Sequence, residues 1–171
     1  HADQTNGLFE LRPFYWKNKK EINIYGSLAT INLLKKRFDY CFKSIVGYPA
    51  IVKGNIIKKT FSIGKYLEKV NFKTEQVTHG HIKSTAYVFE NTAYISDCND
   101  LSIVKMKIFQ NLKYLIIDCM RIKKSRFHFN LDEVLYVNSC LKPKKTILTN
   151  LNSGLKYDFL LKRLPKNVLP A

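Results

Sequence analysis

The order of elements in the second half of the chain constrains the fold most. The segment YVFENTAYI, residues 87–95, predicts two short strands joined by a tight turn, and YLIID predicts a buried strand at 114–118. Asn130 and Glu133 form the pattern of a capping box that opens a helix, and TILT, 146–149, predicts another strand. Strands that alternate with helices in this way predict an α/β protein built in layers.

The first half shows a weaker pattern. Residues 22–25, INIY, predict a short buried strand, and Ser27 is placed to cap a helix that runs to about Phe42. Residues 47–64 contain Pro49, Gly54 and Gly64, which predicts an irregular segment. The other elements expected are a strand at 70–77, a helix after Asp97 that ends near Asn111, and helical turns at 157–164.

Composition excludes some classes of protein. No apolar run reaches the roughly 20 residues that span a bilayer, so no membrane segment is expected and the interpretation is a cytoplasmic protein. The 4 cysteines are too far apart for a Cys-x-x-Cys metal knuckle, and we expect small buried hydrophobes or idle thiols. The net charge of +16 attracts polyanions, but the lysines that supply it are scattered in pairs along the chain.

Polar residues with metal-binding or catalytic chemistry follow the predicted strands. Asp97, Asp118 and Asn150 come at the carboxyl ends of strands, His79 lies in a turn, and His1-Ala-Asp3 precedes a helix. Loops at such strand ends are free of core packing, which is why active sites of α/β proteins gather there. These positions are the candidates for a functional site.

Four segments together resemble the metallo-β-lactamase fold superfamily. HADQTNGLFELRPF resembles the signature His-x-His-x-Asp-His from its second histidine on, so His1 and Asp3 match and Gln4 stands in place of the last histidine. VTHGHIKSTAYVFENTAYISD resembles the turn histidine and the metal-bridging aspartate, which carries over onto His79 and Asp97.

The other two segments lie further along the chain. IIDCMRIKKSRFHFNLDEVL resembles Asp-x-x-Arg followed by His-Pro-x-His-Phe-Ser-Leu-Asp-Glu, and this segment supplies Asp118, Arg121 and His128, with Ser125 in place of the first histidine. TILTNLNSGLKYD resembles a strand that ends in Thr-His-x-x-His, with Asn150 in place of the metal-binding histidine. The patterns are similar to the bacterial phosphodiesterase branch that includes the carbon–phosphorus lyase accessory phosphodiesterase.

The resemblance implies an αββα sandwich that is incomplete at its amino-terminal sheet. Residues 1–171 would form a single partial domain that lacks the amino-terminal strands and the extreme carboxyl-terminal strand. The chain would be either clipped or the product of a decayed gene.

The resemblance also implies a metal-dependent phosphodiesterase with two zinc or manganese ions. The metal residues that remain are His1, Asp3, His79 and Asp97, and His128 and Asp3 are assigned to catalysis. Because Gln4 and Asn150 offer neutral amides where imidazoles are expected, at most one ion and an impaired activity are predicted.

Alternatives remain open. The chain could be a non-catalytic basic module that binds RNA or another polyanion. The expected partner is therefore a small phosphodiester for the enzyme and RNA for the basic module. A homodimer or a complementing amino-terminal segment could cover an exposed sheet edge. His81 is interpreted as exposed and not a ligand. The aromatic residues of the first helix could stack on bases or pack into the core; they are Phe9, Phe14, Tyr15 and Trp16.

Overall fold

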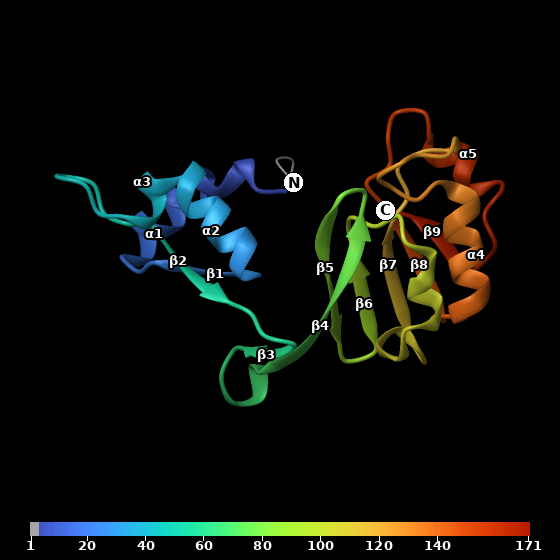
Figure 1. Cartoon of the computed structure of the whole chain (residues 1–171), viewed down its shortest axis with the longest axis horizontal. Helices are drawn as coiled ribbons and strands as arrows, with labels where there is room; N and C mark the ends of the chain where they lie inside the picture. Colours follow the sequence, from blue (N-terminus) through green and yellow to red (C-terminus); the bar gives the residue numbers. More distant parts are fainter. Residues whose placement is uncertain (1–3) are drawn as a thin grey trace. The chain divides into compact units, whose positions relative to one another are not determined.

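The computed structural model describes residues 4–171, with the side chain of Leu67 excepted. The chain forms two compact units that divide after Lys58. They are the amino-terminal unit, which ends at Lys58, and the carboxyl-terminal unit, Lys59–Ala171 (Figure 1).

The amino-terminal unit is a two-stranded parallel sheet with short helices. The Ser27 side chain caps the helix after the first strand, accepting a hydrogen bond from the backbone N–H of Thr30 at 3.2 Å, as the sequence predicts. The strands pair through the register Ile22↔Val52 to Gly26↔Ile56. The elements are η1 (Asn6–Leu11), α1 (Arg12–Asn18), β1 (Ile22–Gly26), α2 (Leu28–Arg37), α3 (Asp39–Phe42) and β2 (Val52–Ile56).

Two expectations for the amino-terminal unit are wrong. The helix expected from Ser27 to about Phe42 is broken at Phe38, whose φ of −128° and ψ of 44° are not helical, so α2 and α3 are separate. The segment 47–64 is not irregular, because it contains β2 and the strand β3 (Thr60–Ile63). Its glycines misled the prediction: Gly54 lies inside β2, where a Cβ would lie 2.9 Å from the Ile31 side chain.

A seven-stranded mixed sheet, in the order β3-β4-β5-β6-β7-β8-β9, forms the carboxyl-terminal unit. Strands β3 to β6 pair antiparallel, and β6 to β9 pair parallel. The strands after β3 are β4 (Val70–His79), β5 (Ile82–Phe89), β6 (Thr92–Ile95), β7 (Tyr114–Asp118), β8 (Lys145–Thr149) and β9 (Val168–Pro170). The mixed α/β class expected from the sequence is confirmed.

The helix α4 (Leu131–Leu141) connects β7 to β8 and runs alongside this end of the sheet (Figure 1). Its capping box is formed as predicted: the Glu133 N–H donates to Asn130 Oδ1 at 2.8 Å, and the Asn130 N–H donates to Glu133 Oε2 at 3.0 Å. Helix α5 (Tyr157–Leu161) lies between β8 and β9. Within the described residues, no helix is long and apolar enough to span a bilayer.

The segment between β6 and β7 differs from the expectation. The predicted helix from Asp97 to about Asn111 is wrong, since this segment forms only two short 3-10 turns, η3 (Leu101–Lys105) and η4 (Lys107–Phe109). Another 3-10 turn, η2 (Tyr66–Glu68), lies between β3 and β4. Each turn buries one apolar side chain completely in the core, Ile103 in η3 and Phe109 in η4. Strand β9 was not expected.

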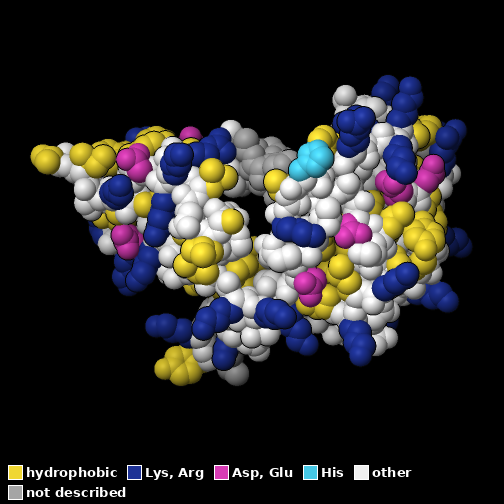
Figure 2. All heavy atoms as spheres, viewed as in Figure 1, with side chains coloured by type: hydrophobic (Ala, Val, Ile, Leu, Met, Phe, Trp, Pro, Cys, Tyr) yellow, Lys and Arg dark blue, Asp and Glu magenta, His cyan; other side chains and the backbone are white. Residues whose placement is uncertain are grey.

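Cysteines and aromatic residues follow the predictions in part. Cys41, Cys98 and Cys119 are buried free thiols, whereas Cys140 is exposed. Of the aromatic residues for which stacking on bases and packing into the core were the alternatives, Phe14 and Trp16 are exposed, so these two do not pack into the core. Lys and Arg side chains are spread over the face drawn in Figure 2 rather than gathered in one block, as their positions in the sequence suggest.

Candidate functional site

Four strands of the large sheet have their carboxyl ends on the same side of the sheet. Strand β4 is antiparallel to β5, which is antiparallel to β6, so β4 points the same way as β6, β7 and β8. His79 is the last residue of β4, Asp97 comes two residues after β6, Asp118 ends β7 and Asn150 follows β8. The strand-end placement predicted for Asp97, Asp118 and Asn150 is therefore observed within this unit, whereas His79, which was expected in a turn, ends β4.

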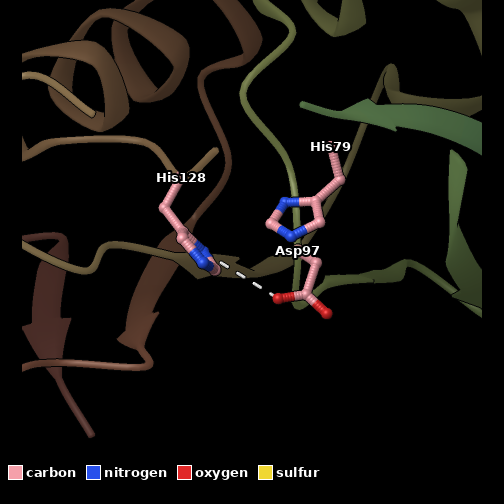
Figure 3. Close-up of side chains that lie close together, drawn as sticks. All are labelled: His79, Asp97 and His128. Carbon is pink, nitrogen blue, oxygen red and sulfur yellow. Dashed lines mark ion pairs between the residues drawn. The ribbon is translucent and has the colours of Figure 1, made fainter. Parts of the chain in front are cut away.

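His79, Asp97 and His128 converge at this edge. Each offers one ligand atom such that all three atoms lie within 4.8 Å of one another. Figure 3 shows the two imidazole rings and the carboxylate directed toward each other from three segments of the chain, with His128 Nδ1 at 3.8 Å from Asp97 Oδ1. The side chains are almost inaccessible: His79 is 1% exposed, Asp97 3% and His128 8%.

The donor set suits a transition-metal ion. Two imidazoles and a carboxylate are donors that zinc and manganese accept, and a buried cluster of this kind is stabilised by a cation. Burial lowers the pKa of His79, with the Asp97 charge acting in the opposite direction. A lowered pKa keeps the imidazole neutral, which is the form that binds a metal. The three residues therefore fit a metal ion of the kind that the sequence resemblance implies.

Asp118 orients His128. His128 Nδ1 and Asp118 Oδ2 lie 2.7 Å apart in a hydrogen bond that needs one proton, held by either the imidazole or the carboxyl. Asp118 is fully buried, and this burial raises its pKa to about 8. Since Nδ1 is engaged in this way, any role of His128 toward a metal or a substrate falls to Nε2.

Asn99, which the sequence analysis did not single out, ties together the two segments that carry the histidines. Its Oδ1 accepts from the Gly80 N–H at 3.0 Å, and its Nδ2 donates to the Arg126 carbonyl at 2.7 Å. Gly80 has a φ of +58°, and a Cβ there would overlap the Phe127 ring. In the sequence, the His79-Gly80 dipeptide was the signal that another segment packs against this turn, because a glycine directly after a candidate ligand indicates close approach by another part of the chain.

Asn150, the residue directly after β8, carries an amide at this end of the sheet. Asn150 has a φ of +57°, and its Nδ2 donates to the Ser96 carbonyl at 2.6 Å. A hydrogen bond from the Asn150 side chain also acts to lower the Asp118 pKa, against the dominant effect of burial. The hydrogen bond to Ser96 thus joins the end of β8 to the residue after β6.

The other predicted site residues have different outcomes. His1 and Asp3 lie outside the described residues, so their metal and catalytic assignments stay predictions. Gln4 is exposed in the amino-terminal unit, and His81 is exposed as expected. The sequence analysis assigned His128 to catalysis, and the structure brings it within the same cluster as the two expected ligands.

Comparison with known proteins gives one family match. The model of the Beta-lactamase superfamily domain matches residues 1–149. This range covers the first unit and most of the second, including His79, Asp97 and His128.

Solved structures with the same fold cover the whole chain. A diphosphatase from the PhnP family is 25% identical, with a TM-score of 0.83, over 100% of this chain and 64% of the other. The metallo-beta-lactamase fold protein YhfI from Bacillus subtilis is 17% identical, with a TM-score of 0.76, over 100% of this chain and 71% of the other.

A curated relative also matches part of its own length. An octanoyltransferase from Porphyromonas gingivalis is 18% identical over 89% of this chain and 30% of that protein. The chain thus spans less than two thirds of the length of this relative and of the diphosphatase.

Proposed function

The chain belongs to the beta-lactamase superfamily, whose model spans residues 1–149, and on this premise we propose that it is a metal-dependent hydrolase of phosphodiesters. The observation that carries the proposal is the convergence of His79, Asp97 and His128 at the carboxyl edge of the sheet. The likeness to a diphosphatase of the PhnP family, with a TM-score of 0.83, supports a phosphorus ester as the substrate.

His79 and Asp97 are proposed to hold the metal, with His1 and Asp3 as further ligands. When bound by these residues, a zinc or manganese ion would supply Lewis-acid chemistry for ester hydrolysis. We expect one ion at most, because Gln4 and Asn150 stand where the family resemblance implies imidazoles. The Asn150 amide donates its N–H to the Ser96 carbonyl.

His128 is proposed to act on the substrate rather than only on the metal. Its Nδ1 is held by Asp118 at 2.7 Å, which fixes the ring so that Nε2 can donate a proton to the leaving oxygen or hydrogen-bond the phosphate. The buried carboxyl thus serves as a positioning residue. Asp3 is proposed to assist catalysis as well.

The test is metal content measured beside hydrolysis. We expect the purified chain to carry up to one equivalent of zinc or manganese, and His79→Ala and Asp97→Asn to lower metal affinity at least about 100-fold. His81→Ala is the matched control, since His81 is two residues away and exposed, and it should retain the metal. Bis(p-nitrophenyl) phosphate serves as the substrate, and chelation should abolish its hydrolysis.

Two further variants divide the roles. His128→Gln should lower kcat by about 10²–10⁴ while leaving most of the metal bound, as expected for a proton donor. Asn150→His should raise the metal stoichiometry above one if this position limits the site. A metal-free chain that binds RNA with a steep loss of affinity in salt would overturn the enzyme proposal and favour the basic module.

A further inference from the structure

The two edges of the seven-stranded sheet differ in what they offer to a further strand. Strand β9 lies at one edge, where Pro170 has no N–H and the Val168 N–H donates to the Pro165 carbonyl at 2.8 Å. Strand β3 lies at the other edge and is paired on one side only, with β4 (Figure 1). An open edge of this kind is a template for another strand.

The backbone groups of Thr60 and Ser62 point outward from β3. The Thr74 N–H donates to the Lys59 carbonyl at 2.8 Å, and these two residues continue the register of β3 with β4. Hydrogen-bonded pairs alternate along antiparallel strands, so Phe61 bonds to β4, whereas the N–H and C=O groups of Thr60 and Ser62 face away from it. Both residues are exposed. The edge therefore offers two donors and two acceptors to an added strand.

A groove of about 740 Å³ lies beside this open edge. It is lined by Thr60 and Ser62 of β3, by their partners Lys73 and Asn71 on β4, and by residues of the segment 107–112. Alternate side chains of a strand point to the same face of a sheet. A strand added beside β3 would therefore direct every second side chain toward this groove.

The surroundings of the groove are mainly cationic. Lys73 and Lys107 line it together with one acidic residue, Glu90. Within residues 4–171, neither lysine forms an ion pair. The segment 59–73, which contains β3 and the turn to β4, has four lysines and one glutamate. Acidic side chains therefore complement the charge on this face of the edge.

The opposite face of β3 is apolar. Phe61 stacks on its partner Phe72, with the ring centroids 5.0 Å apart and the ring planes at 11°. Ile63, two residues further along β3, lies on the same face as Phe61 and is 38% exposed. Apolar side chains of an added strand would pack against this face.

We propose that the open edge of β3 binds an extended peptide segment of another protein, in which acidic and apolar residues alternate. Thr60 and Ser62 supply the backbone hydrogen bonds, the groove takes the acidic side chains, and the face with Phe61 takes the apolar ones. A second copy of this chain fits the edge less well, because each copy carries a net charge of +16. The edge pairs with the start of β4, whereas His79 ends that strand, so the proposal is independent of the proposed hydrolysis.

The first experiment measures peptide binding to the full chain by fluorescence anisotropy. The probe is a labelled, end-capped octapeptide of alternating Glu and Val. We expect it to bind at least about tenfold more tightly than the same peptide methylated on its backbone nitrogens, which cannot donate to the edge. A peptide of alternating Lys and Val is the charge control, and it should also bind at least about tenfold more weakly.

Variants of the chain test the groove. Lys73→Glu should weaken binding of the Glu–Val peptide at least about tenfold, and Lys107→Glu should weaken it in the same direction. Lys123→Glu is the matched control, because this lysine is exposed but does not line the groove, and its affinity should stay within about twofold.

Hydrogen exchange locates the bound peptide. The amides of Thr60 and Ser62 should exchange more slowly in the complex, and the amide of Leu169, in the strand at the other edge, should be unchanged. No binding of the Glu–Val peptide, or equal binding of the three peptides, would overturn the proposal. Protection of Thr60 and Ser62 by self-association that the peptide does not displace would assign the edge to a second copy and also overturn it.

Discussion

The two units differ in how much core stands behind their surfaces. In the amino-terminal unit the buried cluster is Cys41, Ile51 and Val52, with partly buried residues packed around it. In the carboxyl-terminal unit one cluster joins every strand from β4 to β9 with η3, η4, α4 and α5, and it includes the fully buried Phe109 and Phe129. The candidate metal residues His79, Asp97 and His128 lie in the unit with the larger core, where packing can hold three side chains in place.

The sheets differ in the same sense. A two-stranded sheet has two open edges and little surface to bury, whereas a seven-stranded sheet has five strands with neighbours on both sides. The four strand ends of the site belong to β4, β6, β7 and β8, all of which are internal. The comparison predicts that a substitution of the same type lowers the free energy of unfolding more in the carboxyl-terminal unit than in the amino-terminal unit.

The largest expected effect is loss of a core side chain. Phe109→Ala should lower the free energy of unfolding by about 3–5 kcal/mol, because it leaves a cavity inside the extended cluster. Ile51→Ala should lower it by only about 2 kcal/mol, since the smaller cluster can collapse around the change. Urea unfolding followed by circular dichroism measures both. A larger loss for Ile51→Ala would break the comparison.

Thiol labelling measures opening of each unit without mutation. Burial raises the pKa of the Cys98 and Cys119 thiols to about 12, and it also raises the pKa of Cys41, so all three are protonated and unreactive near neutral pH. The exposed Cys140 should label first. Cys41 should follow at least about tenfold faster than Cys98 and Cys119, because the smaller unit opens more easily.

Mass spectrometry of peptides from a labelling time course gives the order of the four thiols. The order of the buried thiols is independent of the metal if the chelator-treated chain gives the same result. Labelling of Cys98 or Cys119 ahead of Cys41 would contradict the proposed difference between the units.

Helix caps give the smallest effect. Asn130→Ala should lower the free energy of unfolding by about 1 kcal/mol, because the bond that Asn130 Oδ1 accepts from the Glu133 N–H at 2.8 Å is lost at a residue that is 7% exposed. Ser27→Ala should cost about 0.5 kcal/mol, because its bond to the Thr30 N–H is longer, at 3.2 Å, and exposed. Thermal unfolding measures both losses. An equal loss for the two variants would show that the contribution of a helix cap does not depend on which unit it lies in.

The sequence correctly predicted the elements for which the local pattern and the tertiary packing favour the same structure. The capping box at Asn130, the cap at Ser27 and the strand YLIID are all where the sequence places them. The predictions failed where packing overrode local signals. The apolar residues between β6 and β7 anchor separate 3-10 turns, and Gly54 sits inside a strand because a helix lies against it.

The site was predicted to a similar extent. His79 and Asp97 could be named because their motifs resemble a family and their positions follow strands. The inclusion of His128 in the cluster and the brace formed by Asn99 were not predicted, because both depend on loops meeting across the sheet edge.

The sequence by itself determined the α/β class, the family and the strand ends that carry polar side chains, because these follow from short-range periodicity and from motifs. Only the folded chain shows which of those side chains meet and which of them are joined by hydrogen bonds. Those properties depend on strand order and on contacts between residues distant in the chain, and no local pattern encodes the distance of 2.7 Å between His128 and Asp118.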